Sequence, residues 1–177
     1  MSKQLRYQGD YFQVWHDQGW EYVTRTHANG IVAIIAVTAA NELVLVEQYR
    51  PPVKRCVLEL PAGLVGDEPE HPTETILDAA RRELLEETGY QADHFTPLAT
   101  YPVSPGMSDE SLSFFHAHTL QKVAAGGGIG VENITVHLAP LANIDEYLAA
   151  YQQNDGLIDI KIYSGLYLLN VATRPRG

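Results

Sequence analysis

Residues 62–90 read AGLVGDEPEHPTETILDAARRELLEETGY, and this stretch decides how the rest of the chain is interpreted. Its second half predicts a helix with one apolar face, because four apolar residues recur at helical spacing: Ile76, Leu77, Ala80 and Leu84. Two starts fit the pattern, one at Pro72–Thr73 and one at a capping box of Thr75 and Asp78. Gly89 is suited to end the helix, because glycine adopts a positive φ without strain at Cβ.

Three carboxylates lie near the end of this predicted helix. Glu83 and Glu87 are four residues apart, at the edge of the apolar face or inside it, and Glu86 lies one step round. Carboxylates this close repel one another, and burial removes their solvation, so positive charge is expected beside them. Arg82 can pair with Glu86, but one guanidinium does not neutralise three carboxylates. Mg²⁺ prefers oxygen ligands, which makes it the predicted counter-ion; a solvated acidic helix end is the alternative.

Residues 82–89, RELLEETG, resemble the core of the Nudix box, GX5EX7REUXEEXGU, in which U is a bulky aliphatic residue. Glu74 precedes this core by seven intervening residues, as the box requires. The interval from Gly63 to Glu74 is five residues longer than in the box, so Gly66–Pro72 is interpreted as an insertion. Tyr90 replaces the last aliphatic residue. Neither departure removes a carboxylate.

Four further segments are similar to one branch of this family, the ADP-ribose pyrophosphatases and nucleoside diphosphate sugar hydrolases: Trp20–Arg25, Glu47–Pro52, Glu59–Leu64 and Ser104–Gly106. Pro105 lies sixteen residues past Gly89, where this branch usually carries a proline. The resemblance implies hydrolysis of the pyrophosphate bond of ADP-ribose or a related nucleoside diphosphate sugar. Two alternatives stay open, a preference for another sugar nucleotide such as GDP-mannose and a non-catalytic nucleotide sensor. The intact box carboxylates disfavour the sensor.

The resemblance also implies roles for single residues. Ligands of Mg²⁺, or of Mn²⁺ in its place, are expected at the carboxylates of Glu83, Glu86 and Glu87 and at the carbonyl of Ala62. Arg82 belongs to the same catalytic set. The general base is expected at Glu132, with Glu110 as its competitor, because a carboxylate on a glycine-rich loop can move toward a metal-bound water.

Substrate contacts are expected on the N-terminal part of the chain and at Pro105. Trp20 resembles the aromatic residue that stacks on the base in this branch, an interaction worth ~1–3 kcal/mol per base. Glu21 and Arg25 sit where its neighbours contact the nucleotide, although packing of Trp20 within its own hairpin is the alternative. Arg50 is a candidate phosphate clamp through its bidentate fork, or else a surface arginine before the Pro-Pro strand end.

The whole chain, residues 1–177, is predicted to form one α+β domain, and the resemblance specifies an α/β/α sandwich around a mixed β-sheet. Residues 1–27 are expected to form an antiparallel hairpin with strands at Tyr7–His16 and Trp20–Thr26. The glycine run from 126 to 130 predicts a mobile loop. In the relatives this hairpin reaches into the partner's site, so a homodimer is implied.

Composition narrows the partners and the compartment. The formal net charge of −10 argues against binding to nucleic acid, which needs many basic residues. One cysteine, Cys56, excludes an intrachain disulfide and fits a reducing compartment. No segment approaches the ~20 apolar residues of a membrane span, and the first residues lack a signal region. A cytoplasmic location is therefore expected.

Overall fold

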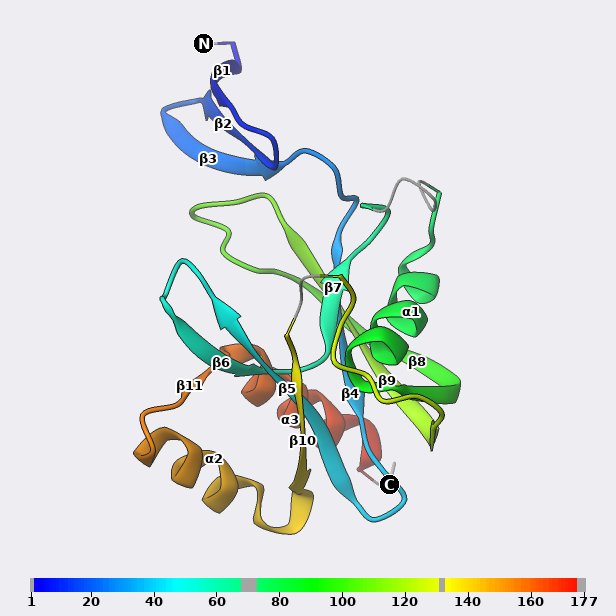
Figure 1. Cartoon of the computed structure of the whole chain (residues 1–177). Helices are drawn as coiled ribbons and strands as arrows, with labels where there is room; N and C mark the ends of the chain where they lie inside the picture. The colour runs from blue at the N-terminus through cyan, green and yellow to red at the C-terminus, as the bar shows by residue number, and fades with distance from the viewer. Residues whose placement is uncertain (1, 68–72, 131–132, 175–177) are drawn as a thin grey trace.

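The computed structural model describes residues 2–67, 73–130 and 133–174. Its first three strands form an antiparallel sheet that projects from the rest of the molecule (Figure 1): β1 (Gln4–Gln8), β2 (Phe12–Asp17) and β3 (Trp20–Arg25). The predicted single strand Tyr7–His16 is wrong, because the chain turns at Gly9 and Asp10 and the Gly9 amide donates to the Phe12 carbonyl at 2.8 Å. Glycine and aspartate are strong turn formers. The N-terminal hairpin is thus a three-stranded sheet.

Two further sheets of four strands each form the body of the molecule, in place of one mixed sheet. The first has the order β7-β4-β9-β8, built from β4 (Ile31–Ala36), β7 (Ala62–Leu64), β8 (Tyr90–Pro102) and β9 (Ser111–Lys122). The second has the order β10-β5-β6-β11, built from β5 (Glu42–Arg50), β6 (Arg55–Glu59), β10 (Thr135–Pro140) and β11 (Leu157–Ile158). Each contains one parallel pair, β4 with β9 and β6 with β11.

Strand β4 is buried on both faces, as its continuous apolar sequence predicts. Val32 and Ile34 pack with Ala80 and Leu84 of helix α1 (Ile76–Thr88). On the other face, Ile35 belongs to a second apolar cluster, which includes residues of α2 (Ile144–Gln153) and α3 (Ile160–Thr173). A short 3₁₀ turn, η1 (Leu141–Asn143), precedes α2. Helices therefore cover both sides of the sheets (Figure 1). No helix in the described part of the chain is long and apolar enough to cross a membrane.

Helix α1 has the ends that its sequence predicts. Thr75 is the N-cap, and its hydroxyl accepts a hydrogen bond from the Asp78 amide at 3.2 Å, so the capping box at Thr75 is the observed start. The other predicted start, at Pro72–Thr73, is wrong, because Thr73 lies in a turn before the helix; Pro72 itself lies outside the described residues. Gly89 ends the helix with φ 69°, and its amide donates to the Leu85 carbonyl at 2.7 Å.

The glycine-rich segment after β9 packs on the last turn of α1, so the expectation of a mobile loop is wrong for residues 126–128. The amides of Gly127 and Gly128 donate to the carbonyls of Glu87 and Glu86 at 2.8 and 3.0 Å. The last carbonyls of a helix have no hydrogen-bond donors within the helix, and the amides of this loop donate to two of them. Gly126 contacts Thr88 so closely that an added Cβ would overlap its backbone. Glycine is required here for close approach rather than for mobility.

Candidate active site

Glu83 and Glu87 face strand β7 across the interface between α1 and the first sheet. A Cβ at Gly63 would overlap the Glu83 carboxylate, so this side chain occupies the space that the glycine leaves. The Ala62 amide donates to Glu87 Oε2 at 2.9 Å, and Glu87 is only 3% exposed. The chain segment 62–63 and the glutamates of α1 are therefore brought together, as their shared motif predicts.

Arg82 holds the acidic residues of the motif in place. Its Nε and Nη2 donate to the two carboxylate oxygens of Glu74 at 2.9 and 3.0 Å, and Nη2 also donates to the Leu64 carbonyl at 3.0 Å. Its Nη1 donates to Glu83 at 2.7 Å and to Glu86 at 3.2 Å. The hydrogen bonds to Glu74 and the charge of Glu83 raise the pKa of Arg82, which keeps the guanidinium charged.

Burial raises the pKa of Glu83 to about 7, against the opposing effect of the Arg82 charge. The neighbouring charges of Glu86 and Asp67 act in the same direction as burial. An isolated carboxylate in this position is thus costly to ionise. The site gains from additional positive charge, as the sequence predicts.

A cavity of about 350 Å³ lies beside these carboxylates, and three basic side chains line it together with Glu83 and Glu87. Arg50 donates from Nε and Nη2 to both oxygens of Glu59, at 2.5 and 2.8 Å, so Glu59 occupies this fork and fixes the orientation of the guanidinium. Arg25 pairs with Glu110 at 2.7 Å, and Lys161 pairs with Asp159. The structure thus places the predicted Arg50 and Arg25 at the same cavity.

Lys161 and Asp67 also line this cavity, and the sequence prediction missed both. Lys161 lies in the first turn of α3, where a positive charge is unfavourable against the helix dipole. A lysine at this unfavourable position can be recognised in the sequence as a residue with a role outside its own helix. The sequence does not show which site the side chain reaches. Asp67 lies in the segment interpreted as an insertion and had no assigned role.

Trp20 and Pro105 meet at a separate cavity of about 460 Å³, formed by the N-terminal sheet and the loop before β9. Trp20 is 64% exposed, so it is not packed inside its own sheet. Glu21 does not line this cavity, because it alternates with Trp20 and Tyr22 along β3 and points to the other face. A small cavity of about 180 Å³ shares Arg25 and Ile31 with the cavity at Glu83, and Asp109 with the cavity at Trp20.

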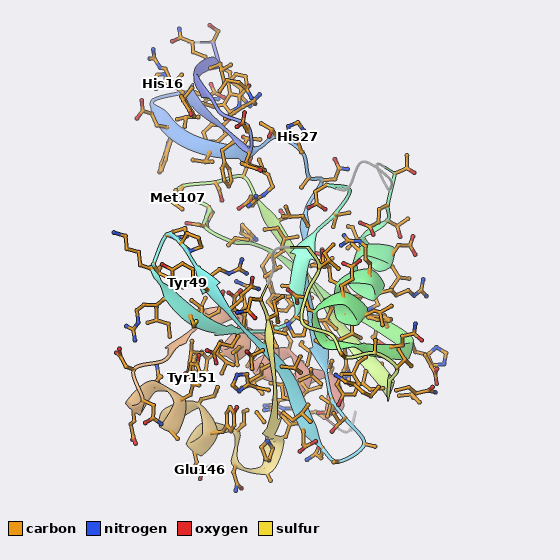
Figure 2. All side chains as sticks on the ribbon, viewed as in Figure 1. His16, His27, Tyr49, Met107, Glu146 and Tyr151 are labelled. Atoms are coloured by element: carbon orange, nitrogen blue, oxygen red, sulfur yellow. The ribbon has the colours of Figure 1, made fainter. Side chains whose placement is uncertain are left out.

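The N-terminal sheet is attached to the loop before β9 of its own chain. The Val23 amide donates to the Met107 carbonyl at 2.8 Å, and the Thr24 hydroxyl donates to Asp109 at 2.7 Å. Figure 2 shows Met107 on the loop that faces this sheet. Glu110, the competing candidate for the base, is engaged by Arg25 at the end of the same loop. Glu132 lies outside the described residues.

The donor set fits a hard divalent ion, because the side chains that converge at α1 offer carboxylate oxygens and no nitrogen or sulfur ligand. Among the described residues, no three aspartate, glutamate, histidine or cysteine side chains are arranged so that they could hold one metal ion together. Arg82 binds one oxygen each of Glu83 and Glu86. A metal ion that binds these same oxygens competes with the guanidinium for them.

Helices cover both sides of the sheets, and the first helix carries the acidic motif beside a cavity. These features define a class of proteins, the α/β/α sandwiches with a Nudix box on the first helix. The chain belongs to the NUDIX family, because the model of the NUDIX domain matches residues 28–147. A solved structure described as an ADP compounds hydrolase has the same fold, with a TM-score of 0.74 and 22% identity over 96% of this chain and 90% of the other. The predicted fold class is thereby confirmed.

Among curated proteins, the chain is 40% identical over 100 residues to a methanol dehydrogenase activator of Bacillus methanolicus, covering 56% of this chain and 51% of the relative. It is 41% identical over 93 residues to an ADP-ribose pyrophosphatase of Bacillus subtilis, covering 51% and 46%. A GDP-mannose pyrophosphatase of Yersinia enterocolitica is 32% identical over 137 residues, covering 72% and 68%. The chain thus spans about half the length of the first two relatives.

Proposed function

We propose that this protein is a divalent-metal-dependent pyrophosphohydrolase, which cleaves ADP-ribose or a related nucleoside diphosphate sugar into a nucleoside monophosphate and a sugar phosphate. One observation carries the proposal: a single cavity is lined by the Glu83 and Glu87 carboxylates and by the cations Arg50 and Lys161. Carboxylates suit the metal, and the cations suit the phosphates of the substrate. The similarity to pyrophosphatases supports the same activity.

The residues of this cavity have distinct roles in the proposal. Mg²⁺ or Mn²⁺, when bound at Glu83, Glu86, Glu87 and Ala62, offsets the charge of the diphosphate and lowers the pKa of the attacking water. Arg82 orients the carboxylates of Glu74, Glu83 and Glu86 through its hydrogen bonds. Arg50, held by Glu59, presents a fixed guanidinium to a phosphate, whereas Lys161 supplies a compact charge.

Glu132 is proposed as the general base, with Glu110 as the competitor. Glu110 accepts a hydrogen bond from Arg25, which gives it a role in fixing that arginine. Glu132→Gln should lower kcat by about 10²–10⁴-fold, the usual contribution of a general base. Glu110→Gln should act mainly on KM through Arg25. The opposite pattern in steady-state kinetics would assign the base to Glu110.

The cavity at Trp20 and Pro105 is proposed to take the nucleobase, with Arg25 between it and the phosphates. An exposed indole suits stacking and tolerates different bases. ADP-ribose and GDP-mannose therefore both remain substrates to test, and the similarity to a GDP-mannose pyrophosphatase favours including the second. A panel of sugar nucleotides, with products read by mass, identifies the preferred base and sugar.

Glu83→Gln tests the proposed function. Removal of this ligand should lower hydrolysis by about 10²–10³-fold, and omission of Mg²⁺ should abolish it in the wild type. Glu146→Gln is the matched control, because Glu146 is exposed on α2, away from α1 (Figure 2). Undiminished hydrolysis by Glu83→Gln would refute the proposed metal site. Nucleotide binding without turnover in the wild type would favour the sensor.

A homodimer is proposed on the N-terminal sheet and the residues beside it, which expose several large apolar side chains: Leu5, Tyr7, Tyr11, Phe12 and Trp20. A small sheet with an exposed apolar surface is stabilised when a second surface covers it. The cytoplasmic location stays a prediction from the sequence.

A further inference from the structure

Asp67 reaches the cavity from the segment that lengthens the motif of this chain. It follows β7 and Gly66, whose φ of 71° turns the backbone in a way that favours glycine. The Gly66 amide donates to Glu74 Oε2 at 3.3 Å, so the turn is attached to the carboxylate that also binds Arg82. The Asp67 side chain is 33% exposed and lines the cavity beside Glu83.

The charges around this cavity are unevenly matched. Three of its cations each have one carboxylate partner, in the pairs Arg25–Glu110, Arg50–Glu59 and Lys161–Asp159. Arg82, in contrast, is shared among several carboxylates: Glu74, Glu83, Glu86 and Asp67. Asp67 is the most distant of these, 3.9 Å from Nη2, beyond hydrogen-bond distance. Among the described residues, four carboxylates therefore lie within 4 Å of the single charge of Arg82.

We propose that Asp67 supplies an additional oxygen ligand to the divalent ion held by Glu83, an inference that rests on the proposed function. A carboxylate at the cavity wall that follows a turn and lies beyond hydrogen-bond distance of the Arg82 guanidinium is available to a hard cation. Asp67 thus adds a metal ligand that the family motif does not contain. More carboxylate ligands raise the affinity for such an ion.

Mn²⁺ binding to the nucleotide-free protein tests this inference without relying on activity. The free Mn²⁺ signal in electron paramagnetic resonance gives the dissociation constant. Asp67→Asn should raise that constant about tenfold or more, because loss of even an indirect partner of a metal ligand typically costs 10–100-fold. Asp155→Asn is the matched control, because it removes the same charge from a side chain that is 93% exposed and pairs with Arg55. It should bind Mn²⁺ like the wild type.

Glu83→Gln separates failure of this inference from failure of the proposed function. If Glu83→Gln weakens Mn²⁺ binding and Asp67→Asn does not, Asp67 is no ligand, while the proposed metal site stands. If the wild type binds no Mn²⁺, both are overturned. Circular dichroism and thermal unfolding show whether Asp67→Asn is folded. Asp67→Glu, which keeps the carboxylate, should recover part of the lost affinity, whereas a merely structural role for Asp67 predicts no recovery.

Discussion

The Glu83 carboxylate occupies the space that Gly63 leaves by having no side chain. Any side chain at position 63 would displace this carboxylate. Gly63→Ala introduces a Cβ that overlaps this carboxylate, and the flexible end of Glu83 has to move away. We expect hydrolysis of the preferred substrate to fall by at least about 10²-fold, because small displacements of catalytic groups carry costs of this size. The protein should remain folded, since the overlap is with a side-chain end rather than with backbone.

Gly30→Ala provides the control for this prediction. Gly30 precedes β4, and an added Cβ would meet only the Ser111 carbonyl, at an ordinary distance of 3.9 Å. Because Gly30 lines the small cavity at Arg25, only kcat serves as the control, and it should match the wild type. If Gly63→Ala retained full activity, the position of Glu83 would not matter for the reaction.

His116 makes the stability of the protein depend on pH. Its ring is half-buried on β9, and its centroid lies 3.8 Å from the centroid of the His118 ring. His118 is hydrogen-bonded to Thr96. Burial, and secondarily His118, lower the pKa of His116 from 6.5 to about 4. The unfolded chain therefore takes up a proton more readily than the folded protein between these values. This contribution to stability is complete above pH 6.5 and is lost as the pH falls toward 4.

Chemical denaturation at pH 7 and pH 5 checks this prediction. His116→Gln should lose less stability than the wild type between the two values, because glutamine does not titrate. His27→Gln, at an exposed histidine between β3 and β4 (Figure 2), controls for the loss of one histidine. An equal loss of stability in wild type and His116→Gln would show that other groups account for the whole dependence.

The sequence predicts the residues of the site that a local pattern or the family resemblance marks. Glu83, Glu86 and Glu87 are recognisable because one helix sets their spacing. Lys161 comes to the same cavity from a helix that begins more than seventy residues later, through tertiary packing that no local pattern encodes. Asp67 was missed for a different reason, because it follows a turn in a segment without a counterpart in the motif.

At the scale of elements, the loop on the last turn of α1 ties the end of the carboxylate helix to the strand β9. Gly126→Ala places a Cβ in the backbone of Thr88, which cannot move away without disturbing that turn. Gly130→Ala also has a positive φ but meets nothing within 4 Å. Both substitutions therefore carry a conformational cost, and only Gly126→Ala adds a steric overlap.

Thermal unfolding of the two variants separates these costs. We expect Gly126→Ala to destabilise the protein by about 2–3 kcal/mol more than Gly130→Ala, from the overlap with buried backbone. For a chain of this size that difference corresponds to roughly 4–12 °C in melting temperature. Equal melting temperatures would mean that the contact between loop and helix contributes little to stability.

Most elements were predictable because their patterns are strong and local. The buried strand β4, the cap of α1 at Thr75 and the closing helix α3 all follow from periodicity and turn residues. Two errors have a physical cause. The break between β1 and β2 is one short turn inside an alternating pattern, and the glycine-rich segment is ordered by contacts with α1, which its composition alone does not reveal.

At the scale of the whole molecule, the two proposed parts of the substrate site lie in different cavities. The cavity at Trp20 shares no lining residue with the one at Glu83, and the N-terminal sheet extends away from the body (Figure 1). If the sheet serves the site of a second copy, the protein must be a dimer. Sedimentation velocity at micromolar protein should show a dimer. Replacement of the exposed Leu5 and Tyr7 by lysine should shift it toward monomer, because charges oppose burial of this surface.

Mixing two impaired variants shows which chain supplies Trp20. Trp20→Ala keeps its own carboxylates, and Glu83→Gln keeps its own indole, so a mixed dimer has one complete site only if Trp20 acts in the partner's site. After unfolding and refolding of an equal mixture, random pairing makes half of the dimers mixed, and about one quarter of the wild-type activity should return at substrate concentrations below KM. Each variant refolded alone gives the baseline. Activity no higher than the mean of those baselines, in a mixture shown to contain mixed dimers, would place Trp20 in the site of its own chain.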